Sequence, residues 1–144
     1  MIPDTYRVKE DNMKISFDFD DTLIWQRVVR DPVDGEIEDF VPAGVNPHVM
    51  PLLHAALRRG DEVHIVTSRH ASRWREDTLS QLREWGVLEA LAGVHFTDGD
   101  WKAPTISRLG ITVHHDDDQD ELDRLPPNCA GVLAPLHPSW GGAR

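Results

Sequence analysis

The feature that most constrains the fold is a repeated pattern in which a short apolar segment runs directly into a cluster of polar residues. The pattern is clearest at residues 14–17 (Lys-Ile-Ser-Phe), which lead into 18–21 (Asp-Phe-Asp-Asp). Further polar clusters stand at 67–69, 98–102 and 114–118. Open parallel sheets bind ligands at the carboxyl ends of their strands, so segments distant in sequence can converge on one crevice there. The pattern therefore predicts an α/β fold with a polar site at one edge of a parallel sheet.

The first polar cluster places two carboxylates two residues apart, where a strand is expected to end. Because side chains alternate along an extended chain, Asp18 and Asp20 can point the same way as the backbone leaves the sheet. One carboxylate can attack phosphorus and the other can transfer protons, while an oxygen-liganded Mg²⁺ reduces the repulsion between two anions. Taken alone, an Asp-x-Asp pair is also typical of a solvated turn, so it gains weight only from the clusters that follow.

With the four clusters in this order, the sequence resembles the haloacid dehalogenase-like superfamily of aspartyl-phosphate hydrolases from roughly Lys14 to Leu133. The resemblance implies a nucleophile, a general acid/base, hydroxyls that bind the phosphoryl group, a charge-neutralising lysine and acidic metal ligands. In that order the roles fall on Asp18, Asp20, Thr67 with its neighbour Ser68, Lys102, and Asp116 with Asp117. One position departs from the family's pattern, because Asp21 stands where many members have glycine.

The reaction that the resemblance implies is Mg²⁺-dependent hydrolysis of a phosphomonoester through an aspartyl-phosphate. Asp18 would attack phosphorus, and Asp20 would protonate the leaving oxygen and then deprotonate the hydrolytic water. A dehalogenase would not need the second acid, because halide leaves without a proton. The resemblance places Mg²⁺ on the Asp18 carboxylate, the Asp20 backbone carbonyl and Asp116, with Asp117 as a further candidate ligand.

Lys102 is unusual because the chain has only two other lysines, Lys9 and Lys14, whereas arginine occupies every other basic position. A compact ammonium can sit between a carboxylate and a phosphoryl oxygen without the bidentate geometry of a guanidinium. Alone, a lysine before the helix expected at Ala103–Leu109 would be interpreted as a surface residue. Beside the other clusters, it is expected to act at the site.

Alternating periodicities predict a three-layer, Rossmann-like α/β domain. The expected sheet strands are about Lys14–Phe19, Glu62–Val66, Val94–Thr97, Ile111–His114 and Ala130–Leu133. The expected helices are 46–60, begun by Asn46-Pro47 and ended by Gly60, then Ala71–Trp85, Ala103–Leu109 and Gln119–Leu125. Right-handed crossovers predict a five-stranded parallel sheet in the order 3-2-1-4-5.

The length predicts a single domain over 1–144, with a core at about 14–133 and an irregular tail at 134–144. Two strand-like segments flank the tight-turn pair Asp34-Gly35, which predicts a small flap hairpin at about 24–42. The spacing leaves little room for a large lid domain, so the crevice is expected to be open.

The composition and charge of the chain limit the classes of molecule that it is expected to bind. A formal net charge of −10 opposes binding to nucleic acid or anionic membranes and fits small phosphorylated substrates better. No segment approaches the roughly 20 apolar residues of a membrane span, and the N-terminus lacks a signal-peptide pattern, so a cytoplasmic location is expected. The single cysteine, Cys129, excludes an internal disulfide and is expected to be a small residue entering the last strand.

Histidines and tryptophans beside the clusters have alternative interpretations. His114 and His115 could join a transition-metal site, but the oxygen-rich surroundings favour Mg²⁺. Trp25 and Trp101 could stack on a base or a sugar, although packing in the flap or core is the more common role.

Three further expectations concern helices. Arg69, Arg73 and Arg75 could guide an anionic substrate, but arginines on a helix usually form a solvated face. Asp120 is expected to cap the helix at 119–125. The spacing of Trp74, Thr78, Leu82 and Trp85 predicts a buried face with both tryptophans in the core.

Three functions remain open from the sequence. The favoured one is a Mg²⁺-dependent phosphomonoesterase acting on a phosphorylated small molecule. A nucleotide or nucleic-acid-end phosphatase is an alternative that the open crevice supports and the acidity opposes. A non-catalytic metal- or phosphate-binding interaction module is the third, which the joint presence of Asp18, Asp20, Thr67 and Lys102 opposes.

Overall fold

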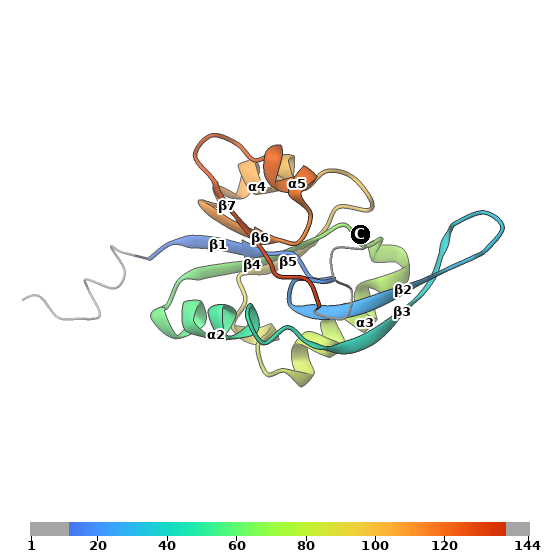
Figure 1. The fold of residues 1–144 in the computed structure, drawn as a ribbon. Coiled ribbons are helices and arrows are strands. Elements are labelled where there is room, and N and C mark those ends of the chain that lie inside the picture. Colours follow the sequence, from blue (N-terminus) through green and yellow to red (C-terminus); the bar gives the residue numbers. More distant parts are fainter. Residues whose placement is uncertain (1–11, 138–144) are drawn as a thin grey trace, which may run out of the picture.

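The computed structural model describes residues 12–137 and is built around a five-stranded parallel sheet (Figure 1). The sheet strands are β1 (Lys14–Phe17), β4 (Glu62–Thr67), β5 (Gly93–Phe96), β6 (Val113–Asp116) and β7 (Ala130–Leu133). Their order is β5-β4-β1-β6-β7, which is the predicted 3-2-1-4-5 order once the two hairpin strands are left uncounted. The α/β class, the parallel pairing and the central first strand are therefore confirmed.

The central position of β1 determines where the polar clusters meet. Ile15 of β1 pairs with Val63 of β4 on one side and with Val113 of β6 on the other. Parallel strands in register end at the same edge, so the residues that follow β1, β4 and β6 are brought together.

Helices cover both faces of the sheet, as the crossovers require. They are α2 (Met50–Arg59), α3 (Ala71–Glu84), α4 (Ala103–Leu109) and α5 (Gln119–Asp123), with a 3₁₀ helix, η1, at Leu88–Ala90. Figure 1 shows α2 and α3 on one face and α4 and α5 on the other. The chain changes face after β5 because the next strand, β6, lies on the opposite side of β1.

Two apolar clusters hold the strand ends in place. On the side of α2 and α3, Leu53 and Leu82 are fully buried with Phe17 and Ile65 of the sheet. On the side of α4 the buried cluster contains Val66, Ile106, Ile111 and Cys129. Full burial of such a side chain contributes about 1.5–3 kcal/mol to folding. Cys129 is buried just before β7, as predicted.

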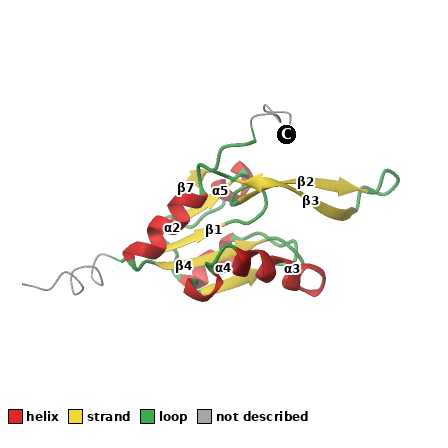
Figure 2. Ribbon diagram, turned by 90° about the horizontal axis from the view of Figure 1, so that it is seen from below, coloured by secondary structure: helices red, strands yellow, loops and turns green. Residues whose placement is uncertain are grey.

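The predicted flap is present as an antiparallel hairpin of β2 (Ile24–Arg30) and β3 (Ile37–Val45). It projects beyond the body of the sheet in both Figure 1 and Figure 2. The Asp31 carboxylate accepts the backbone N–H groups of Val33 and Asp34, and Gly35 takes a left-handed φ of 74°. The second strand runs three residues further than expected, to Val45.

The start of α2 differs from the prediction. The helix begins at Met50 rather than near Asn46. The Asn46 side chain accepts the N–H of His48, and its backbone carbonyl accepts the N–H of Met50, so Asn46 organises a turn before the helix. Pro51, rather than Pro47, occupies the first helical turn. Gly60 ends the helix with a φ of 83°, as predicted.

Other element boundaries also differ from the predicted ones. Strand β1 ends two residues before the predicted Phe19, β6 begins two residues after the predicted Ile111, and η1 was not predicted. Helix α5 is capped by Asp118, whose carboxylate accepts the N–H of Asp120, so the expected cap at Asp120 is wrong.

The tryptophans of α3 are less buried than expected. Thr78 and Leu82 are buried, but Trp74 and Trp85 are half-buried at the ends of the helix face. Trp85 stacks on Phe19, so it covers the core rather than filling it.

Within the part of the chain that the structure describes, no helix combines the length and the apolar character needed to cross a membrane. Residues 134–137 follow β7 without regular structure, and the rest of the predicted tail, 138–144, lies outside the described residues.

Candidate active site

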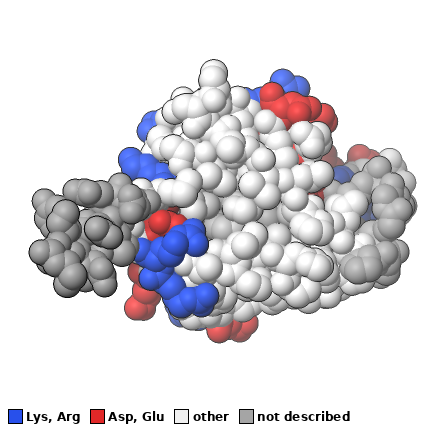
Figure 3. Space-filling model, turned by 60° about the vertical axis from the view of Figure 1, so that its left-hand side comes forward, with Lys and Arg blue, Asp and Glu red and all other residues white. Residues whose placement is uncertain are grey.

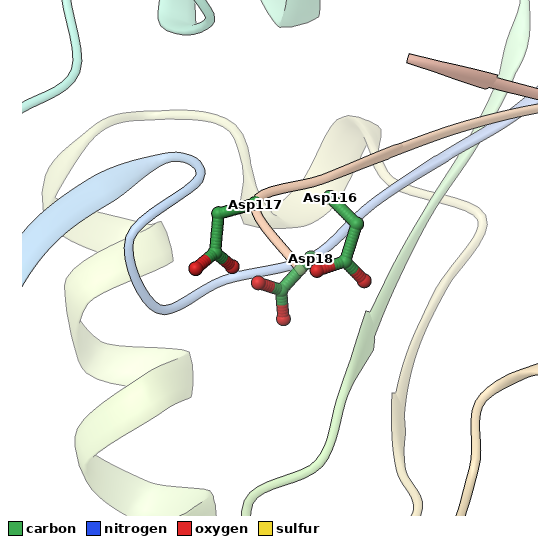
Figure 4. A group of neighbouring side chains, drawn as sticks. All are labelled: Asp18, Asp116 and Asp117. Carbon is green, nitrogen blue, oxygen red and sulfur yellow. The ribbon is translucent and has the colours of Figure 1, made fainter. Parts of the chain in front are cut away.

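Three carboxylates meet at the carboxyl edge of the sheet (Figure 4). Asp18 follows β1, Asp116 ends β6, and Asp117 follows β6 directly. One oxygen from each of the three lies within 4.8 Å of the others. Asp18 and Asp116 are buried, whereas Asp117 is half-buried. The parallel pairing of β1 with β6 thus brings together acids that are far apart in sequence.

The turn after β1 explains how the first acidic motif is held. The Phe19 carbonyl accepts the N–H of Leu23 at 3.1 Å, which folds the chain back after Asp18. Asp21 has a φ of 60°, a left-handed conformation that Asp and Asn adopt more readily than other side-chain-bearing residues. Its carboxylate also accepts the N–H of Gln26 at 2.9 Å. The left-handed backbone and this hydrogen bond together explain how Asp is accommodated at position 21.

Lys102 reaches into the acidic cluster from the start of α4. Its ammonium nitrogen lies 3.2 Å from Asp18 Oδ1, 2.9 Å from Asp116 Oδ2 and 3.4 Å from Glu121 Oε2. The lysine is buried, so these ion pairs are shielded from water. The structure therefore brings Lys102 together with Asp18 and Asp116, as expected. Glu121 was missed because its place on a short, acidic helix gave no sign that it is buried.

The charges of the cluster are unevenly balanced. Burial raises the pKa of Asp18 well above its usual value, and repulsion from Asp116 adds to the effect. Burial also acts upward on Asp116, but its hydrogen bond with His114 and the Lys102 ammonium lower its pKa to about 2. Burial opposes the charged form of Lys102, yet Asp18 and Asp116 raise its pKa above the usual value. Lys102 and Asp116 thus form a stable ion pair, and Asp18 remains crowded by negative charge.

A buried hydrogen-bond chain orients Asp116. Ser16 Oγ lies 2.6 Å from His114 Nδ1, and His114 Nε2 lies 2.9 Å from Asp116 Oδ2. All three side chains are fully buried. His114 therefore orients the Asp116 carboxylate by a hydrogen bond. The alternative of a transition-metal site that includes the histidines receives no support. His115 stacks on Phe17 with ring centroids 4.4 Å apart.

Asp20 is held by Arg69, which was predicted from the sequence to lie on a solvated helix face. That assignment is wrong, because Arg69 is buried. Its Nε and Nη2 donate to the two Asp20 oxygens at 2.9 and 2.7 Å, and its Nη1 donates to Thr78 Oγ1 at 2.8 Å. Gln26 also donates to the Asp20 carboxylate. Burial raises the pKa of Asp20 in spite of these donors. The signal that could have identified Arg69 is its place at the strand end, two residues before α3 begins.

The two predicted hydroxyls differ in exposure. Thr67 is fully buried at the end of β4, where its Oγ1 accepts the N–H of Arg69 at 3.3 Å. Ser68 is exposed and lines the cavity beside the acids. Of the pair, Ser68 is the residue that lines the cavity.

The acids open into a cavity of about 700 Å³. Its lining includes the cluster of Asp18, Lys102, Asp116 and Asp117. Residues of the hairpin and of the first turn of α3 also line it. The cavity is therefore larger than a phosphoryl group requires and has room for the rest of a substrate.

The tryptophans near the crevice have different surroundings. Trp25 is buried, and its indole N–H donates to the Pro135 carbonyl at 3.3 Å. It therefore packs in the core, which is one of the packing roles expected for it. Trp101 is 47% exposed and lies against Arg124, whose guanidinium carbon is 3.7 Å from the ring centroid.

Replacing Arg69 by lysine is expected to lower the free energy of unfolding by about 1.5–3 kcal/mol, because a single ammonium cannot reproduce the paired bonds to Asp20 and the bond to Thr78. Urea denaturation measures the change, and Arg75→Lys on the exposed part of α3 is the matched control. Stability equal to that of the wild type would show that the Arg69–Asp20 pair contributes little.

The fold and the site together define an α/β protein with an acidic, lysine-bridged cluster at the carboxyl edge of its sheet. No protein-family model matches the sequence, and no curated protein matches it. Among solved structures, the chain is similar to one described as "putative 3-deoxy-D-manno-octulosonate 8-phosphate phosphatase from Vibrio cholerae". The two are 13% identical with a TM-score of 0.47, over 86% of this chain and 68% of the other. The fold class rests on the strand order and pairing of this chain itself.

Proposed function

We propose that this protein is a Mg²⁺-dependent phosphomonoester hydrolase that acts through an aspartyl-phosphate at Asp18, as its resemblance to the haloacid dehalogenase-like superfamily implies. The observation that carries the proposal is the convergence of Asp18, Lys102 and Asp116 from three separate elements, with the lysine within 3.2 Å of both carboxylates. A structural ion pair needs one partner. Here one ammonium serves several buried acids, an arrangement typical of a site that binds further charged groups.

Each residue has a defined task in this mechanism. The Asp18 carboxylate attacks phosphorus and the ester oxygen leaves. Lys102 stabilises negative charge on the phosphoryl oxygens, and Ser68, beside Thr67, offers a hydroxyl to them. Asp20 donates a proton to the leaving oxygen and then accepts one from the hydrolytic water. Burial raises the pKa of Asp20, the direction that favours proton donation, and Arg69 orients the carboxyl group.

The donor set fits Mg²⁺, which prefers oxygen ligands. Asp18, Asp116 and Asp117 would hold the ion, together with the backbone carbonyl of Asp20. When bound, the ion supplies positive charge between the anionic nucleophile and the anionic phosphate. Its charge would also counter the burial and the repulsion from Asp116 that raise the pKa of Asp18.

A phosphorylated small molecule is the substrate class that the formal net charge of −10 favours. In the face shown in Figure 3, Lys and Arg side chains form small groups near the margins around a largely uncharged middle. Such a face offers no continuous basic surface for a nucleic-acid backbone. The burial of Trp25 also removes one of the residues that favoured a nucleotide ligand.

Hydrolysis of sugar phosphates, nucleotides and phosphorylated oligonucleotide ends with MgCl₂ tests the proposal directly. We expect turnover that disappears when Mg²⁺ is removed with EDTA and returns when it is restored. With Mg²⁺, beryllofluoride should raise the melting temperature, because a ligand that binds the folded form stabilises it. A raised melting temperature without turnover would favour the non-catalytic interaction module instead.

A further inference from the structure

We propose that the substrate carries a second anionic group, a carboxylate or a second phosphate, and that it is recognised by Arg30 and Arg73, which line the same cavity as the acids. This inference rests on the proposed phosphatase function, because it names the substrate class of the same site. The first anion is the phosphoryl group at Asp18 and Lys102.

The cavity lining draws on two groups of residues from different elements. One group is the carboxylates with Lys102, as described above. The other group is Arg30 and residues 35–37 of the hairpin, together with His70, Ser72 and Arg73 near the start of α3. A molecule that fills the cavity from the acids outward therefore meets two arginines, in a protein whose formal net charge is −10.

Both arginines are held in place by neutral groups. Arg30 donates from Nη1 to the Gly35 carbonyl at 2.9 Å. Arg73 donates from Nη1 to the Ile37 carbonyl at 2.8 Å and from Nη2 to the Glu38 carbonyl. Backbone carbonyls fix the direction of a guanidinium without cancelling its charge. Nothing in these contacts neutralises either arginine.

Three acidic residues come into question as partners of the two arginines. Glu36 also lines the cavity, and Glu76 and Asp77 follow Arg73 by one turn of α3. Among residues 12–137, the ion pairs within 4.0 Å include neither Arg30 nor Arg73. Both positive charges therefore remain available to a ligand.

The remaining hydrogen-bond donors match an anion. A guanidinium has five N–H donors, of which Arg30 uses one and Arg73 two in the contacts above. The planar fork of donors suits the paired oxygens of a carboxylate or phosphate. A neutral hydroxyl would satisfy the donors less well and would leave the charge of each arginine unpaired.

Matched substrate pairs test the inference. Glucose 6-phosphate and 6-phosphogluconate differ by one carboxylate, and fructose 6-phosphate and fructose 1,6-bisphosphate differ by one phosphate. With MgCl₂, we expect kcat/KM for the doubly anionic member of at least one pair to exceed that of its partner by about tenfold or more, mainly through a lower KM.

Alanine variants then assign the preference to residues. Arg30→Ala and Arg73→Ala should each reduce the ratio within the pair toward one. The control is Arg75→Ala, on the same helix but outside the cavity lining, where its guanidinium lies 5.0 Å from the Phe96 ring; it should keep the wild-type ratio. Arg73 also binds the backbone of the hairpin that carries Arg30, so a hairpin loosened by Arg73→Ala would displace Arg30 and lower the ratio as well. Arg30→Ala, whose contact lies within the hairpin, is therefore the variant that tests direct recognition.

The outcomes separate this inference from the proposed function. Hydrolysis without preference for the doubly anionic member of either pair would overturn the second anion site and leave the phosphatase intact. If no phosphate ester is hydrolysed, the proposed function fails, and calorimetric titration of the same pairs into the Asp18→Asn protein with MgCl₂ decides the inference. Equal affinities within both pairs would refute it, whereas tighter binding of the doubly anionic members that Arg30→Ala removes would support it.

Discussion

Replacing Asp18 by asparagine is expected to lower kcat for aryl phosphate hydrolysis on the order of 10⁴-fold or more, to the background rate, because an amide oxygen is a far weaker nucleophile than a carboxylate. The amide keeps the size and shape of the side chain, so the cavity should be preserved. The measurement is initial rate with a saturating aryl phosphate and MgCl₂.

The control for this variant is Asp123→Asn, an equally conservative change at an exposed position of α5. Its activity should match that of the wild type. Undiminished turnover in Asp18→Asn would remove Asp18 as the nucleophile and with it the proposed mechanism.

Stability should not follow activity in the Asp18 variant. Burial and the neighbouring Asp116 raise the pKa of Asp18, which means that its charged form is disfavoured in the folded protein. Removing that charge is therefore expected to leave the urea midpoint unchanged or to raise it. A loss of activity without a loss of stability would identify a functional carboxylate rather than a structural one.

Replacing Lys102 by methionine is expected to have the largest effect on stability, about 3–5 kcal/mol, because it leaves Asp18, Asp116 and Glu121 buried without their shared counter-ion. Methionine is similar in length and apolar, so lost packing contributes little. Urea denaturation at neutral pH measures the change. The exposed Lys14, changed to methionine, is the matched control and should leave the midpoint close to that of the wild type.

The destabilisation by Lys102→Met should depend on pH in a defined direction. Without the ammonium, the pKa of Asp18 in the folded state rises further above its unfolded value. Such a group is protonated more in the folded than in the unfolded state, so stability falls as pH rises above the unfolded pKa. The difference between wild type and variant should therefore be larger at about pH 8 than at about pH 5. A difference independent of pH would mean that Lys102 acts mainly through packing.

Elements with strong local signals were predictable from the sequence. The hairpin was predicted from its Asp-Gly turn, and Gly60 was correctly predicted to end α2 because it adopts a left-handed φ there. The strand order followed from the alternation of strands and helices and from the handedness of crossovers. Errors arose where competing side-chain contacts decided a boundary. Asn46 is an example, because its side chain bonds to His48 and stabilises a turn rather than the helix end.

In the candidate site, too, local features were predictable from the sequence and long-range contacts were not. The chemical types at Asp18, Lys102 and Asp116 were recognisable because each follows a strand or precedes a helix. The residues that contact them in the folded protein were not recognisable from the sequence. Arg69 and Glu121 looked like surface residues, since local sequence carries no information on which charges become buried against each other.

By itself, the sequence determined the period of each segment and the chemical groups at the strand ends, because both depend on residues close together in the chain. Tertiary structure alone decided which of those groups face one another, since the distances from Lys102 to Asp18 and Asp116 and from Arg69 to Asp20 depend on how the strands pair. It also decided the charge state of the cluster, because burial and neighbouring charges shift a pKa only once the chain has folded.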